Sequence, residues 1–366
     1  MASRWLGPAG FGEYTVLMAV MLSFGRPLEA LSPFVARTLI EYPARSLRDL
    51  LPIALISGLA LGAVQLIFLV FWRTPLTLPQ IILFLLAAST LPAWSLLYAY
   101  RGLLQAKKRD ALYLLSRPVE LTVRLLASGV FFALGGRVIS AITAGLIGII
   151  ASIGQINFSV RPGYFLSFKV DRKLFLDYLK IMLITLAGGF FIGLDMIIAG
   201  KVFSPEDCGR YALISLIGKG VLIYAFLIFP LLYPRLVEHR ISKKGLYYLG
   251  VGYLFSAAVF GAAFIIFFFW GGMLIPFFFG EVYRKSADYL PAYLLAVFPL
   301  CLNYGVVNLK AAFGGWSECI FLWAALALYS ILLLTSPPVF YDYFLRMGIF
   351  QLIAAAAGFW FLARRS

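Results

Sequence analysis

Seven charged residues lie inside long apolar stretches of the sequence, four of them basic and three acidic: Arg26, Glu29, Arg117, Glu120, Arg124, Asp195 and Lys219. Arg26 and Glu29 are three residues apart, and Arg117, Glu120 and Arg124 are spaced by three and four, so each group lies on one face of a helix. If these stretches cross a membrane, their charged residues usually face a bundle interior or a water-filled path. Fixed cations there suit an anionic ligand, and the carboxylates suit exchange of a proton or a sodium ion.

Local pairing is an alternative for two of these groups. Arg26 and Glu29 can neutralise each other as an ion pair, and Asp195 can either pair with Lys219 or lie at the outer interface. Lys180 also lies inside an apolar stretch, but it is close enough to the start of that stretch to extend to the membrane surface.

The group around Glu120 keeps a net positive charge, because two arginines share one carboxylate. We therefore predict that four cations bind an anionic substrate: Arg26, Arg117, Arg124 and Lys219. Three carboxylates are predicted to act as charge partners or as the group that couples transport to H+ or Na+: Glu29, Glu120 and Asp195. The sequence does not choose among these three.

The elements that hold these residues are predicted to be membrane-spanning helices. Of the 366 residues, 62% are hydrophobic and only 13% are charged, and the mean hydropathy is +0.93, whereas a soluble domain is nearer half apolar and a quarter charged. Uncharged runs such as 50–71, 138–160 and 245–280 are long enough to cross a bilayer. The sequence thus predicts an all-α integral membrane protein with about eleven spans: 14–35, 50–71, 80–101, 111–134, 137–159, 176–200, 210–234, 246–271, 288–311, 318–336 and 343–363. The run 245–280 leaves room for a re-entrant or interfacial segment besides its helix.

The distribution of basic residues predicts the orientation. Alternate connections between the spans differ more than twofold in Lys and Arg content, and the richer set, to which Arg101 is assigned, ends with Arg364 and Arg365. The positive-inside rule then places the C-terminus in the cytoplasm and the N-terminus outside, in a multi-pass protein of the cell (inner or plasma) membrane.

An eleven-residue pattern occurs twice. "RWLGPAGFGEY" at 4–14 and "KVFSPEDCGRY" at 201–211 align with a constant offset of 197 residues, and Pro33 and Pro230 follow at the same offset. This repeat predicts two related helical lobes, 1–160 and 176–366, joined by a cytoplasmic linker at 161–175. Since a span precedes only the second copy, the first lobe is expected to lack its leading helix.

Other classes of protein find little support. The net charge of +15 is explained by membrane orientation, so we expect no nucleic-acid partner. Three cysteines and one histidine have no ligand-like spacing, so we expect neither a metal nor a cofactor and interpret the cysteines as apolar filler. No HExxH, GxSxG or Walker motif is present, and the expectation is a monomeric protein that is not an enzyme.

Both copies of the repeated pattern resemble the segment after the first helix of each half in polysaccharide flippases of the multidrug/oligosaccharidyl-lipid/polysaccharide exporter superfamily. "FPLLYPRLVEHR" at 229–240 and "RGLLQAKKRDALYLLSRPVE" at 101–120 resemble two further junctions of that family. The resemblance implies two lobes arranged in a V around a central cavity, and alternating access. It also implies that an isoprenoid-pyrophosphate-linked oligosaccharide moves to the outer leaflet for cell-surface polysaccharide synthesis.

Three alternatives remain. The first is a multidrug cation antiporter of the same superfamily, which would use carboxylates in an apolar cavity. The second is a truncated membrane protein that transports nothing. The third is a polysaccharide polymerase or ligase, whose chemistry would need larger outer loops than the stretch 272–287 provides.

Overall fold

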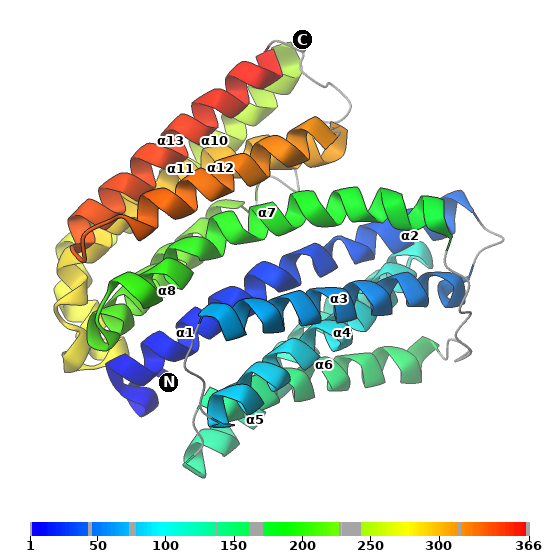
Figure 1. Cartoon of the computed structure of the whole chain (residues 1–366), viewed down its shortest axis with the longest axis horizontal. Helices are drawn as coiled ribbons and strands as arrows, with labels where there is room; N and C mark the ends of the chain where they lie inside the picture. Colours follow the sequence, from blue (N-terminus) through cyan, green and yellow to red (C-terminus); the bar gives the residue numbers. More distant parts are fainter. Residues whose placement is uncertain are drawn as a thin grey trace. The chain divides into compact units, whose positions relative to one another are not determined.

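The computed structural model describes residues 2–42, 46–72, 78–135, 138–160, 171–226, 228, 243–313 and 316–363. These residues form helices and no strand, which confirms the predicted all-α fold (Figure 1). The helices are α1 (Ala2–Glu29), α2 (Leu31–Glu41), α3 (Leu47–Trp72), α4 (Leu78–Ala106), α5 (Asp110–Ala133), α6 (Val138–Val160), α7 (Arg172–Val202), α8 (Pro205–Phe226), α10 (Lys243–Phe279), the short 3-10 helix η1 (Glu281–Tyr283), α11 (Ser286–Phe313), α12 (Trp316–Leu334) and α13 (Phe340–Ala363).

Six helices among the described residues are long and apolar enough to cross a membrane: those at Leu47–Trp72, Gln80–Ala106, Val138–Ser159, Leu174–Val202, Pro205–Ala225 and Tyr247–Phe279. The last of these corrects an expectation, because the run 245–280 contains one continuous helix and no re-entrant segment. Its apolar side chains point in all directions, and Phe268, Phe269 and Trp270 are exposed, as expected for a surface that faces lipid.

The first predicted span, 14–35, is an interrupted helix. α1 ends at Glu29 and α2 begins at Leu31, with Ala30 between them. Pro33 has no N–H to donate to the carbonyl of Glu29, which explains why the helical ladder breaks at this point. Its repeat-related partner, Pro230, lies outside the described residues.

Two compact units are defined by the contacts within the chain. One comprises 20–189 and is here called the N-terminal unit; the other comprises 1–19 and 190–366 and is called the C-terminal unit. Both boundaries fall inside helices, in α1 and in α7. The predicted lobes, 1–160 and 176–366, describe the sequence repeat and stay a prediction.

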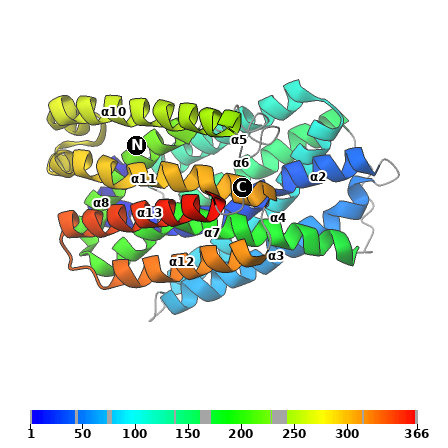
Figure 2. The same ribbon diagram turned by 90° about the horizontal axis from the view of Figure 1, so that it is seen from above.

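Each unit is a helical bundle. In the N-terminal unit α4 packs on α2, α3 and α6, and α5 packs on α6. In the C-terminal unit α10, α11, α13 and α12 lie side by side in that order, as Figure 2 shows, and α8 packs on α10 and α11. Cys208, Cys301 and Cys319 are buried thiols and not disulfides, in agreement with their interpretation as apolar filler.

The two copies of the repeated pattern pack against each other within the C-terminal unit. A β-carbon on Gly12 would lie 2.8 Å from the backbone nitrogen of Gly209, and a β-carbon on Gly209 would overlap the carbonyl of Pro8. Gly12 and Gly209 occupy equivalent positions of the repeat. Glycine at both positions therefore allows the two backbones to touch.

Candidate functional site

The N-terminal unit holds a polar network centred on α4. Trp94, Tyr98 and Arg101 lie on one face of this helix, at spacings of four and three residues. Arg101 forms a salt bridge with Glu120 of α5, with 2.8 Å between Nη2 and Oε2, and its Nε donates to Ser116 Oγ at 2.9 Å. The side chain of Arg101 is only 2% exposed, so the pair is shielded from solvent.

Two aromatic side chains extend this network. The Trp94 indole N–H donates to Glu120 Oε1, and the Tyr98 hydroxyl donates to Glu29 Oε1, each at 3.4 Å. The Arg101 guanidinium carbon lies 5.4 Å from the centre of the Tyr98 ring, within the range of a cation–π contact. Tyr98 and Arg101 therefore link Glu29 on α1 to Glu120 on α5.

Arg101 corrects two expectations from the sequence. It was assigned to a cytoplasmic connection, but α4 continues to Ala106 and buries it. Glu120 was expected to be shared by Arg117 and Arg124, whereas its salt bridge is to Arg101. The sequence signal for this network was the spacing of Trp94, Tyr98 and Arg101, which places them on one helix face. Because the predicted span ended at residue 101, Arg101 was counted with the connection that follows it.

Arg26 and Glu29 form the local ion pair that the sequence left open. Their closest N–O distance is 3.8 Å and both side chains are partly exposed, so the pair is weak. Arg26 lies against α7, where a β-carbon on Gly189 would be 3.0 Å from the Arg26 Cβ. Lys180 forms an exposed pair with Asp177 at 3.6 Å, which agrees with a position near the membrane surface.

The two remaining arginines of α5 differ in their surroundings. Arg117 is exposed, and none of the salt bridges among the described residues includes it. Arg124 is half-buried along α6, where a β-carbon on Gly148 would lie 3.1 Å from its Cβ. Three arginines, Arg101, Arg117 and Arg124, stand against the one carboxylate of Glu120, so these four side chains together carry a net positive charge.

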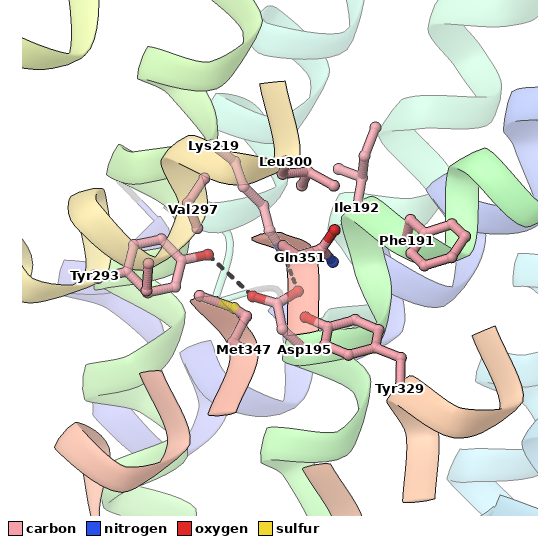
Figure 3. Close-up of a pocket in the computed structure, with 11 residues that line it drawn as sticks. Phe191, Ile192, Asp195, Lys219, Tyr293, Val297, Leu300, Tyr329, Met347 and Gln351 are labelled. Atoms are coloured by element: carbon pink, nitrogen blue, oxygen red, sulfur yellow. Dashed lines mark hydrogen bonds and ion pairs between the residues drawn. The ribbon is translucent and has the colours of Figure 1, made fainter. Parts of the chain in front are cut away.

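A second polar cluster lies in the C-terminal unit, around Asp195 (Figure 3). Its Oδ1 accepts from the Lys219 ammonium at 2.8 Å, and its Oδ2 accepts from the hydroxyls of Tyr211 and Tyr293 at 2.7 and 2.9 Å. The Tyr343 hydroxyl donates to the Asp195 backbone carbonyl at 2.6 Å. Side chains of α8 and α11 thus bind the Asp195 carboxylate, and a side chain of α13 binds the backbone carbonyl of the same residue of α7.

This cluster resolves an alternative that the sequence left open. Asp195 pairs with Lys219 rather than lying at the outer interface, and the side chains are only 4% and 18% exposed. The three tyrosines were missed. They are far apart in the chain, and no spacing rule relates residues of different helices.

A small, partly open cavity adjoins this cluster. The volume of this cavity, measured as the space open to the centre of a water molecule, is about 10 Å³. Its wall includes Asp195, Lys219, Tyr293, Tyr329 and Gln351. Among the described residues, no group of three or more His, Cys, Asp or Glu side chains could hold a metal ion. It stays a prediction that one common cavity is lined by Arg26, Arg117, Arg124 and Lys219.

Comparison with protein-family models gives no match, and comparison with curated proteins gives none either. Solved structures do match over nearly the whole chain. A multidrug resistance MATE family transporter of the MOP superfamily in an inward-facing conformation aligns with a TM-score of 0.64 at 12% identity, covering 100% of this chain and 90% of that one. A MATE structure in complex with MaD3S aligns with a TM-score of 0.67 at 14% identity, covering 98% and 88%.

A MOP superfamily transporter from Pyrococcus furiosus aligns with a TM-score of 0.66 at 14% identity, covering 100% of this chain and 88% of that one. That transporter is described as having a binding pocket whose reverse polarity suggests a different function. At these identities the likeness establishes the fold alone. The chain therefore has the fold of MATE transporters of the MOP superfamily.

Proposed function

We propose that this protein is a multi-pass membrane transporter that moves an isoprenoid-pyrophosphate-linked oligosaccharide from the cytoplasmic to the outer leaflet. Alternating access around a central cavity would carry the head group past the hydrocarbon, for cell-surface polysaccharide synthesis. The shared fold with MATE transporters supports the transport part of this proposal. The substrate class rests on the charges of the N-terminal unit.

The engagement of Glu120 by Arg101 is the observation that carries the substrate class. Glu120 offsets only one of the three arginines Arg101, Arg117 and Arg124, so this group of side chains keeps a net positive charge. Two guanidinium groups on one helix face suit a pyrophosphate, because each can donate two parallel hydrogen bonds to phosphate oxygens. An organic cation would be repelled by the same face.

The second candidate is a multidrug cation antiporter, whose binding site would carry negative rather than positive charge. Several structural neighbours are described as multidrug resistance or MATE transporters, which supports this second candidate. Direct binding separates the two: purified protein should retain a lipid pyrophosphate and not an organic cation such as ethidium. The reverse result would favour the antiporter.

The coupling group remains one of three carboxylates: Glu29, Glu120 and Asp195. Glu29 is the most exposed of them and is held only by weak contacts. Glu120 and Asp195 each carry a short salt bridge, so protonation there would have to displace a cation.

Replacing Arg117 and Arg124 together by glutamine should reduce flipping of the lipid-linked glycan at least a hundredfold, because two charge-assisted contacts to phosphate are lost. Complementation of a flippase-deficient strain, with membrane insertion checked by blotting, measures the loss. The matched control replaces Arg37 and Arg48, which lie outside the predicted spans, by glutamine and should complement normally. Full complementation by the Arg117/Arg124 variant would refute the cationic site.

The orientation is tested by cysteine labelling. In a chain without Cys208, Cys301 and Cys319, a cysteine replacing Lys244 should be protected from impermeant thiol reagents in intact cells and should react after permeabilisation. A cysteine replacing Glu281 should react in intact cells. If position 244 labels readily in intact cells, the proposed cytoplasmic C-terminus is wrong.

A further inference from the structure

A groove lies at the end of α10, on the surface of the C-terminal unit. Its volume, measured as the space open to the centre of a water molecule, is about 510 Å³, which is within the range of small-molecule binding sites. The wall consists of four residues of α10 and two of the turn that follows: Gly272, Met273, Pro276, Phe277, Glu281 and Arg284. None of these residues belongs to the proposed transport site.

Two glycines shape this groove. Gly272 and Pro276 are one helical turn apart and lie on the same face of α10. A β-carbon on Gly272 would meet no atom within 4 Å, so this face is open to a ligand. Gly280 ends the helix with a φ of 105°, a left-handed value that glycine adopts without strain. The turn that it allows brings Glu281 and Arg284 to the border of the groove.

The groove lies at the level of the lipid head groups. α10 has 37 residues and is therefore about 55 Å long. Even at a tilt of about 40° it would extend about 42 Å across the membrane, whereas the hydrocarbon core is about 30 Å thick. Its ends thus reach the head-group layers. The exposed Trp270, a residue type enriched at that level, lies two turns before Phe277.

The apolar part of the groove is accessible to lipid. α10 is the least buried of the six spans and lies at the end of the row of helices α10, α11, α13 and α12 (Figure 2). Met273 and Phe277 are both largely exposed. Acyl chains of the bilayer can therefore pack along this face, as they do on any lipid-facing helix. What distinguishes this face is the charged pair at its end.

This pair is a salt bridge that keeps further hydrogen-bonding capacity. Arg284 Nε and Nη2 each lie 2.7 Å from one carboxylate oxygen of Glu281. A guanidinium has five N–H groups, so three are left over, and the carboxylate oxygens have further lone pairs. The hydrogen bonds from Arg284 lower the pKa of Glu281, so this carboxylate is ionised at neutral pH. The groove therefore ends in a positive donor beside a negative acceptor.

These charges select the head group. Glu281 and Arg284 sum to zero, and so do the next two charged residues, Lys285 and Asp288. A purely anionic head group would gain attraction from Arg284 and lose a similar amount by repulsion from Glu281. A zwitterionic head group can set its phosphate against Arg284 and its cation against Glu281. A primary ammonium also donates N–H groups to the carboxylate, whereas a quaternary ammonium has none to donate.

We propose that this groove is a selective binding site for phosphatidylethanolamine of the surrounding leaflet. The phosphate accepts from Arg284, the ammonium donates to Glu281, and an acyl chain lies along Met273 and Phe277. This lipid site is additional to the proposed transport function and does not depend on it. The competing occupant is a second copy of the chain, and the experiment below separates the two.

Photo-crosslinking tests the site. The full-length protein is placed in phosphatidylglycerol nanodiscs that contain a small fraction of a lipid with a diazirine on its acyl chain and an ethanolamine, choline or glycerol head group. Labelled peptides are identified by mass spectrometry, and labelling of the exposed Leu328 and Ile331 of α12 is the reference for non-selective contact. Relative to this reference, the ethanolamine lipid should label the segment 272–279 about 3- to 10-fold more than the other two lipids.

The variants Glu281→Gln and Arg284→Gln, made separately, should each lose most of this preference. The pair is exposed, so neither change should impair folding. Asp207→Asn is the matched control, because Asp207 pairs with Arg210 at the same three-residue spacing but does not line the groove. This variant should be labelled like the wild type.

Three results would overturn the proposal. The first is equal labelling of the segment 272–279 by the three lipids, or stronger labelling by the glycerol lipid. The second is an ethanolamine preference that survives both Glu281→Gln and Arg284→Gln. The third is absence of lipid adducts on this segment while α12 is labelled, which would show that protein covers the groove. Because the assay measures no transport, its result is independent of Arg117 and Arg124.

Discussion

Replacing Glu120 by alanine is expected to destabilise the protein by about 3–5 kcal/mol, because it leaves the Arg101 guanidinium buried without its counter-charge. Ser116 still accepts one hydrogen bond from Arg101, but a neutral hydroxyl cannot replace a carboxylate. Unfolding of the purified protein in detergent, followed by intrinsic tryptophan fluorescence, measures the loss.

Two further variants complete this test. Removing both charges with Arg101→Met and Glu120→Leu should cost less than Glu120→Ala alone, because no buried charge remains unpaired. Glu41→Ala is the control; its partner Arg37 is 75% exposed, so this loss should lie within about 1 kcal/mol. A Glu120→Ala protein as stable as the control would show that Arg101 is not held as described.

Removing the Asp195 carboxylate with Asp195→Ala should be similarly severe, at about 3–5 kcal/mol, because it strands the Lys219 ammonium together with the hydroxyls of Tyr211 and Tyr293. Lys219→Met should cost less, since the carboxylate keeps two hydroxyl donors. Tyr211→Phe should cost least, about 1.5–3 kcal/mol for one hydrogen bond to a charged group. The same unfolding measurement gives the order.

The order of these losses is the diagnostic result. If Lys219→Met were at least as destabilising as Asp195→Ala, then the carboxylate would not be the centre of the cluster. Lys180→Met provides the comparison for an exposed lysine, because its pair with Asp177 is longer and open to solvent. It should be close to the wild type in stability.

The helices were predictable because apolar length is a local property of the sequence. The helical fold follows from that signal, and the long uncharged run at 245–280 needed only the correction that it is one helix. The exact ends of the helices were harder to predict, because a charged residue near the end of a span can belong either to a buried turn of the helix or to an exposed connection. Arg101 was misplaced for that reason.

Only the charged residues of the site could be predicted from the sequence. Ionisable residues in apolar spans were identified because they are costly there, and both Asp195 and Lys219 were found in this way. Their hydrogen-bond partners were not, because Tyr211, Tyr293 and Tyr343 come from three helices whose adjacency no local pattern encodes. The choice of Arg101 over Arg117 and Arg124 as partner of Glu120 likewise depends on how α4 and α5 pack.

The contact between Gly12 and Gly209 limits which substitutions the two copies of the repeated pattern tolerate. Here each copy is part of the surface that the other touches, and the touching atoms are backbone atoms, which no compensating side chain can move aside. A side chain at either glycine would therefore collide with the backbone of the other copy, which explains why both copies have glycine at this position.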